Sequence, residues 1–226
     1  RAGETPGLQQ LRVTVIEDLG AWGDPAVIAE ARRRFGTFMH DPRAISPNDQ
    51  SMIFDVVGRY ADAAAFNELH TLANQSRDET KKSRLYRALA LVRDRKLAAQ
   101  AADIAIGPEI PPQLTMLRLE MLASMRTQHP KLAWAAFSGH VKTLLSPLGD
   151  LAPLVEAQYV PQLFWNSLPL DQMQAWLKAR VPAAMGPQIA TGMASARFQV
   201  AQKAQLVPEA RAYLATPASH LPRLRR

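Results

Sequence analysis

Apolar residues recur along this chain with the three- and four-residue spacing of amphipathic helices. One stripe runs through Val27, Ala31, Phe35 and Phe38, behind Asp24 as N-cap and Pro25 at the first helical position. Similar stripes fall in residues 11–22, 53–60, 66–73, 85–92, 97–104, 114–125 and 134–144. No segment alternates apolar and polar residues convincingly, and no Asn-Gly or Asp-Gly hairpin turn occurs. The pattern predicts an all-α protein.

The predicted helices repeat in pairs. Helix starts at Asp24, Asp62, Asp94 and Pro130 are 38, 32 and 36 residues apart, and each start follows a short linking turn after another helix. Residues 40–48 and 107–112 carry the prolines expected of loops between helices. A period of this length is typical of stacked helical hairpins. We expect an α-solenoid of stacked antiparallel helix pairs, like HEAT or armadillo repeats, with Trp134 in its core.

The regularity fades after Ser146. Prolines then divide the chain into shorter predicted helices, at positions 147, 153, 161, 169, 182, 187 and 208. We expect an irregular C-terminal third that caps the solenoid. The whole chain, residues 1–226, is predicted to be a single helical-repeat domain with loose ends at 1–7 and 217–226, and the C-terminal fragment of a larger enzyme.

The composition and charge of the chain indicate which kinds of partner it can bind. The net charge is +7, but Lys and Arg are spread along the whole chain, which favours solvated helix faces over a phosphate-binding stripe. We expect no specific nucleic-acid binding. The chain contains no cysteine, and no apolar run approaches the roughly 20 residues of a membrane span. We expect a soluble protein without a membrane partner, in the cytoplasm or else periplasmic or secreted.

Motifs of catalysis are missing from the sequence. None of the five histidines belongs to a His-Glu-x-x-His motif, and no two of them lie one helical turn apart. There is no glycine-rich phosphate loop and no Gly-x-Ser-x-Gly elbow. We therefore predict no catalytic residue, no metal ligand and no cofactor in this chain, and we interpret the histidines as surface or helix-cap residues.

Several stretches together resemble the C-terminal domain of the gluzincin zinc aminopeptidases, the group of the puromycin-sensitive, alanyl and endoplasmic-reticulum aminopeptidases. Their order and spacing carry the resemblance. In chain order they are Gly23-Asp24-Pro25 through Ala31-Arg32-Arg33-Arg34-Phe35, loop 41–49 with Ile45 before Pro47, Leu85-Tyr86-Arg87-Ala88-Leu89-Ala90 with Arg93-Asp94-Arg95-Lys96-Leu97, Glu109-Ile110-Pro111-Pro112-Gln113, and Pro130-Lys131-Leu132-Ala133-Trp134.

The resemblance implies a non-catalytic role. In such enzymes zinc is held by an upstream catalytic domain, and the helical domain closes over that site and shapes a chamber for peptides. The implied partners are the upstream catalytic domain of the same polypeptide and peptide substrates, and the implied zinc lies outside this chain. Two alternatives remain: a stand-alone α-solenoid interaction module and a basic helical-repeat protein that binds nucleic acid.

Arg118 and Glu120 are the candidates for contact with peptides. They interrupt the apolar stripe of the helix that follows Pro111-Pro112, in the middle of the predicted array. An arginine there could bind the C-terminal carboxylate of a peptide through two parallel hydrogen bonds. The simpler interpretation is that Arg118 lies on a solvated helix face.

Overall fold

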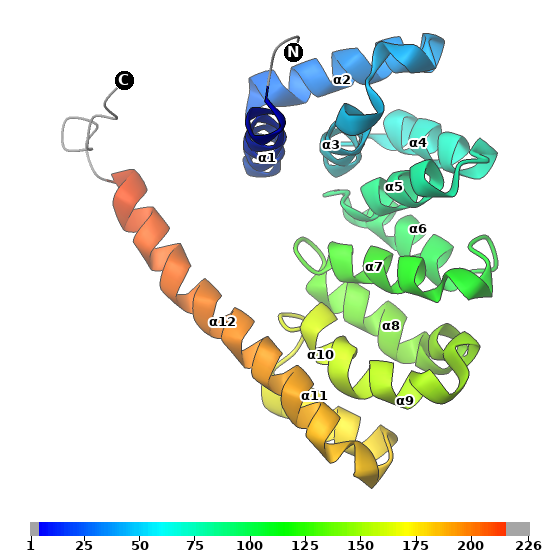
Figure 1. Cartoon of the computed structure of the whole chain (residues 1–226), viewed down its shortest axis with the longest axis vertical. Helices are drawn as coiled ribbons and strands as arrows, with labels where there is room; N and C mark the ends of the chain where they lie inside the picture. The colour runs from blue at the N-terminus through cyan, green and yellow to red at the C-terminus, as the bar shows by residue number, and fades with distance from the viewer. Residues whose placement is uncertain (1–4, 216–226) are drawn as a thin grey trace. The chain divides into compact units, whose positions relative to one another are not determined.

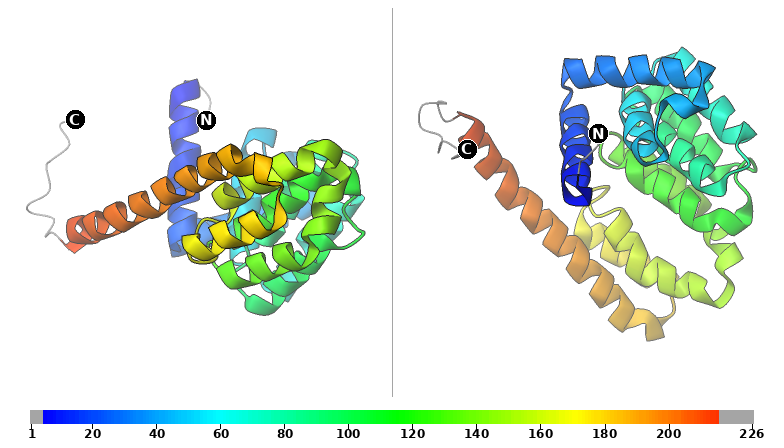
Figure 2. Two further views of the ribbon diagram at one scale, coloured as in Figure 1. Left: turned by 90° about the horizontal axis from the view of Figure 1, so that it is seen from below. Right: turned by 45° about the horizontal axis from the view of Figure 1, so that its top comes forward.

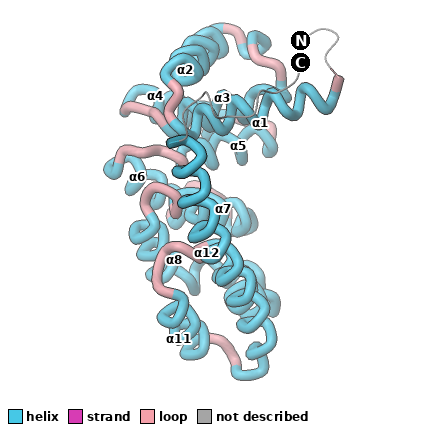
Figure 3. The backbone as a smooth tube through the Cα atoms, turned by 90° about the vertical axis from the view of Figure 1, so that its left-hand side faces the viewer, coloured by secondary structure: helices cyan, strands magenta, loops and turns pink. Residues whose placement is uncertain are grey.

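The computed structural model describes residues 5–215, and every regular element in that range is helical (Figures 1 and 3). The chain folds into two compact units, Arg1–Leu148 and Gly149–Arg226. Each unit is described by itself below. Within residues 5–215, no helix combines the length and the apolar character that a membrane crossing requires. The predicted all-α fold is confirmed.

The first unit consists of helices joined by short loops. Its elements are α1 (Pro6–Trp22), α2 (Pro25–His40), η1 (Pro42–Ala44), α3 (Pro47–Arg59), α4 (Ala63–Gln75), α5 (Glu79–Ala90), α6 (Arg95–Ile106), η2 (Pro112–Leu114), α7 (Thr115–Met125) and α8 (Pro130–Leu145). The carboxylates of Asp24, Asp62 and Asp94 accept backbone hydrogen bonds at the N-termini of α2, α4 and α6. With Pro130 opening α8, all four predicted helix starts are confirmed.

The helices of the first unit stack as pairs. The second helices of successive pairs contact one another, α3 on α5 and α5 on α7 (Figure 1). The first helices lie against them, with α2 on α3, α4 on α5 and α6 on α7. The solenoid of helix pairs is therefore confirmed. Its core is aromatic at one end, where the ring of Phe54 meets those of Phe35 and Phe38 edge-on.

Gly58 lets α3 and α5 approach closely. A Cβ atom at this position would overlap the backbone carbonyl oxygen of Ala88 on α5. Because the obstacle is backbone, a flexible side chain cannot turn aside to make room. The contact fixes the register between the two helices, and with it the positions of the charged side chains that they carry.

Helix α1 packs through a different face from the one predicted. It crosses α2 steeply (Figure 2) and contacts α2 and α3, with Gly20 against Val56. Of the predicted stripe, Leu11, Val15 and Trp22 are exposed, and Trp22 keeps 79% of its surface. The apolar residues of α1 extend beyond one face, so their spacing did not specify which side packs. The helix begins at Pro6, so residues 6 and 7 of the predicted loose end 1–7 are helical; residues 1–4 and the predicted loose end 217–226 lie outside the described range.

Trp134 is only partly buried. It lies on α8 with its ring 5.7 Å from that of Phe137, and Phe137 is fully buried while Trp134 is not. The prediction of a core position therefore holds for Phe137 and only in part for Trp134.

The second unit is irregular, as predicted. After η3 (Ser146–Leu151) at the boundary, it contains α9 (Ala152–Leu154), the π-helical turn η4 (Val155–Tyr159), α10 (Val160–Leu163), α11 (Leu170–Arg180), η5 (Ala183–Met185) and α12 (Gly186–Ala215). The Arg180 guanidinium donates to the Glu156 carboxylate at 2.6 Å. The break expected at Pro208 is wrong, because Pro208 lies inside α12, which Figure 1 shows as one continuous helix. The flanking residues are exposed, so the proline ring disturbs no packed neighbour.

Candidate functional site

Arg118 is a buried residue. Only 3% of its surface is exposed, its Nε donates to the carbonyl oxygen of Ile110 at 3.1 Å, and a terminal nitrogen donates to that of Gly107. Burial lowers the pKa of its guanidinium. The side chain thus holds the loop before α7, and its interpretation as a solvated residue is wrong. Contact between Arg118 and a peptide stays a prediction.

Glu120 is the exposed member of the predicted pair. About half of its side-chain surface is accessible, 47%, and its Oε2 lies 3.9 Å from the guanidinium of Arg87 on α5. The two residues border an open hollow of about 370 Å³ between α5 and α7. Its remaining lining residues come from α5: Glu79, Thr80, Ser83 and Arg84. Glu120 is therefore placed where a bound molecule can reach it.

The arginines of this hollow are positioned by their helix. Arg84 and Arg87 are three residues apart on α5, so they project from neighbouring turns of one face. Arg84 also donates from Nη1 to the carbonyl oxygen of Pro47 at the start of α3, at 3.2 Å. Together with the close contact at Gly58, this bond ties α5 to α3. The wall of the hollow that α5 provides is therefore held in place against α3.

Asp55 on α3 adds a carboxyl group close to Arg87. Its Oδ1 is buried and accepts no hydrogen bond from the described residues. Burial raises the pKa of Asp55 to about 7, and the nearby negative charge of Glu17 on α1 adds to this rise. The positive charges of Arg87 and Arg59 oppose it. A carboxyl group in this setting gains from any additional hydrogen-bond donor or positive charge that approaches it.

We call the surface defined by Asp55, Arg84, Arg87 and Glu120 the α3–α5–α7 face. Its two guanidinium groups and the Glu120 carboxylate can pair with the carboxylate and ammonium groups of a peptide, while the Asp55 carboxyl is buried near Arg87. Across residues 5–215, no group of three or more His, Cys, Asp or Glu side chains could hold a metal ion. That this chain carries no cofactor stays a prediction.

A second polar cluster lies away from this face. The carboxylate Oε1 of Glu109 is 2.7 Å from Nε2 of His70 on α4, and it accepts a hydrogen bond from the Tyr86 hydroxyl at 2.8 Å. The same hydroxyl lies 3.0 Å from Oδ1 of Asn74. Burial, followed by the bond to Glu109, raises the pKa of Tyr86. Since Glu109 belongs to the loop before α7, the cluster anchors that loop to α4 and α5.

Glu120 was predicted from the sequence as a candidate, whereas its neighbours Arg87 and Asp55 were not. Asp55, Arg87 and Glu120 are 32 and 33 residues apart, close to the repeat period, and each lies on the second helix of a pair. Comparing equivalent positions of the repeats would have grouped them. His70 was assigned to the surface because its partner, Glu109, lies 39 residues away, and no local spacing indicates a contact of that kind.

The stacked helix pairs define a helical-repeat protein whose candidate site is a charged open face. A family model described as the ERAP1-like C-terminal domain matches residues 1–197. The chain belongs to this family, the helical C-terminal domains of M1 aminopeptidases, which confirms the resemblance found in the sequence. Membership implies linkage to an upstream catalytic domain.

Proposed function

We propose that this chain is the non-catalytic C-terminal domain of a zinc aminopeptidase, and that it closes over the active site and shapes the chamber that holds the peptide. In this proposal the zinc ion and the residues of hydrolysis belong to the upstream catalytic domain. The observation that carries the proposal is the α3–α5–α7 face in a chain of this family. The charges of Arg84, Arg87 and Glu120 line its open hollow, and stacked helices hold them in fixed positions.

The chemistry of the face suits peptides of varied sequence. Arg84 and Arg87 can bind carboxylates of acidic side chains or of a C-terminus, and Glu120 can accept hydrogen bonds from ammonium groups and backbone N–H groups. Exposed charge pairs contribute only about 0.2–1 kcal/mol each in water. A face of this kind therefore binds peptides weakly and with little sequence selectivity. Weak and unselective binding is what the wall of a peptide chamber requires.

The exposed stripe of α1 supports docking onto the catalytic domain. Leu8, Leu11, Val15 and Trp22 recur with helical spacing on one side of α1, and all four are exposed. An apolar stripe of this kind on a soluble domain commonly marks a contact with another protein surface. We assign it to the upstream domain of the same polypeptide. Peptides then meet the polar α3–α5–α7 face, and the apolar stripe serves assembly.

The test is a charge reversal in the full-length enzyme. In the Arg87→Glu and Glu120→Lys variants, the Michaelis constant for peptides of about ten residues should change by about two- to fivefold, the range of a single exposed ion pair. The kinetics on a small aminoacyl amide, which is too short to reach this face, should stay unchanged. Glu68→Lys, which reverses an exposed charge on α4, is the matched control and should affect neither substrate.

Two results would contradict the proposal. Equal changes on peptides and on small amides would point to an effect on the catalytic domain itself. Unchanged kinetics on both substrates in both variants would remove the α3–α5–α7 face from the peptide path.

A further inference from the structure

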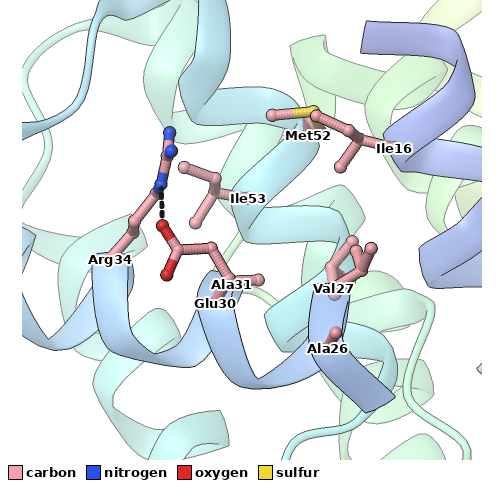
Figure 4. Close-up of a pocket in the computed structure, with 9 residues that line it drawn as sticks. Ile16, Ala26, Val27, Glu30, Ala31, Arg34, Met52 and Ile53 are labelled. Carbon is pink, nitrogen blue, oxygen red and sulfur yellow. Dashed lines mark hydrogen bonds and ion pairs between the residues drawn. The ribbon is translucent and has the colours of Figure 1, made fainter. Parts of the chain in front are cut away.

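A small apolar cavity lies between α1, α2 and α3 of the first unit (Figure 4). Its volume is about 250 Å³. Side chains from all three helices form its walls, and except for Glu30 and Arg34 they are aliphatic or methionine: Ile16 from α1, Ala26, Val27 and Ala31 from α2, and Met52, Ile53 and Val56 from α3. The cavity is separate from the α3–α5–α7 face, with which it shares no lining residue.

One edge of the cavity is charged. The Glu30 carboxylate accepts hydrogen bonds from Nε of Arg33 and Nε of Arg34, each at 2.8 Å (Figure 4 shows the Arg34 bond). These bonds lower the pKa of Glu30 to about 2, so it stays ionised at neutral pH. Two guanidinium groups face one carboxylate, and the edge therefore keeps one net positive charge.

Arg34 can bind a further anion. Among the described residues, its Nε alone has a partner, Glu30, and both terminal nitrogens stay available as donors. A neighbouring hollow of about 320 Å³ is lined by Arg33, Arg34, Thr37 and Ala44. Arg34 thus lines both the apolar cavity and the neighbouring basic hollow.

We propose that this cavity binds an aliphatic monocarboxylate, with the hydrocarbon chain between α1, α2 and α3 and the carboxylate on Arg34. The planar guanidinium fork matches a carboxylate in geometry and charge. The size of the cavity limits the chain. A dry apolar cavity of about 150 Å³ can bind benzene, which has six carbons, so the present volume suits a chain of about eight to ten carbons.

The first test is a chain-length series on the wild-type chain. Straight-chain carboxylates from butanoate to dodecanoate are titrated by calorimetry, and the ¹³C-labelled methyl group of Met52 reports where they bind. Affinity should rise about fourfold per methylene, the equivalent of about 0.8 kcal/mol, and level off near ten carbons. The Met52 resonance should move, whereas that of Met116, which is exposed on α7, should stay in place.

The second test separates the charge from the apolar contact. Octanoate should bind wild-type protein at least about tenfold more tightly than octanol, and Arg34→Gln should abolish this difference while leaving octanol binding unchanged. Arg43→Gln removes the same charge from a side chain that is 93% exposed and lines neither space, so it should bind octanoate like wild type. Val27→Trp, which fills the cavity, should weaken both ligands.

The comparison of octanoate with octanol on the wild-type protein does not depend on whether any variant folds. Octanol binding as tightly as octanoate, or no movement of the Met52 resonance with any carboxylate, would overturn the proposal. So would self-association of the chain that octanoate does not reverse but Val27→Trp abolishes, because the occupant would then be a second copy of this chain.

Discussion

The two units of this chain are helical for different reasons. In the first unit the helix pairs repeat the same local devices: an aspartate caps the first helix, a loop with proline or a short turn follows, and a second helix packs on the preceding pair. In the second unit short helical pieces precede one 30-residue helix, and a partly buried ion pair, Glu156 with Arg180, joins segments 24 residues apart. Repeated local signals produce a regular array, whereas single long-range contacts produce an irregular one.

The largest effect should come from the closest helix contact of the first unit. Gly58→Val places a side chain against the carbonyl oxygen of Ala88, so we expect destabilisation of about 3 kcal/mol or more. This corresponds to a melting temperature lower by about 6–12 °C in a chain of this size. Calorimetry measures the shift, and hydrogen exchange should locate the loss of protection in α3 and α5.

Gly36→Ala is the matched control for Gly58→Val. Gly36 lies inside α2, and an added Cβ would meet no atom within 4 Å. The substitution should raise stability by about 0.5–1 kcal/mol through helix propensity. A Gly58→Val protein as stable as wild type would mean that α3 and α5 are not in this register.

The second unit should respond to loss of its ion pair. Glu156→Ala leaves Arg180 without its carboxylate, and we expect destabilisation of about 2 kcal/mol, below the range of fully buried pairs because Arg180 is partly exposed. The loss of hydrogen-exchange protection should be confined to α10, α11 and α12. An equal loss in α3 and α5 would show that the two units unfold together, and the contrast between them would then fail.

Asp55 should make the stability of the first unit depend on pH. Its folded-state pKa of about 7 lies above the value of about 3.9 in an unfolded chain, so the folded state binds more protons between these values. Stability therefore falls as pH rises from about 4 to 7 and is constant above. Asp55→Asn should stabilise the protein by about 1–2 kcal/mol at pH 8 and have little effect at pH 4.

Asp103→Asn, which changes an exposed carboxyl group on α6, is the control for Asp55→Asn. It should alter stability by less than about 0.5 kcal/mol at either pH. Parallel pH profiles for wild type and Asp55→Asn would contradict a raised pKa at Asp55.

Features with local causes were predictable from the sequence. The caps at Asp24, Asp62 and Asp94 act within their own helical turn, so their positions gave the helix starts and the repeat. Glu120 was proposed as a candidate because it interrupts an apolar stripe. Arg118 interrupts the same stripe, yet it is buried, since its partners are carbonyl groups of a loop whose path the sequence pattern does not reveal.

The misplaced features depend on contacts between helices. The exposed side of α1 was mistaken for its packed side because the contact of Gly20 with Val56 decides the orientation, and no spacing within α1 indicates it. The predicted break at Pro208 overlooked that an exposed helix can tolerate the loss of one hydrogen bond. Arg87, the ion-pair partner of Glu120, comes from α5 in a separate repeat, so no spacing within α7 indicates it and only a comparison between repeats could have done so.

We expect the α3–α5–α7 face to lie beside a bound peptide in the full-length enzyme. Photo-crosslinking tests it directly, with benzoylphenylalanine in place of Glu120 and, in a control protein, in place of Glu68 on α4. A non-hydrolysable peptide of about ten residues should be crosslinked from position 120, and an excess of unlabelled peptide should suppress the product. Position 68 should give none. Absence of a crosslink at position 120, or equal crosslinking from both positions, would contradict a peptide-facing role for this face.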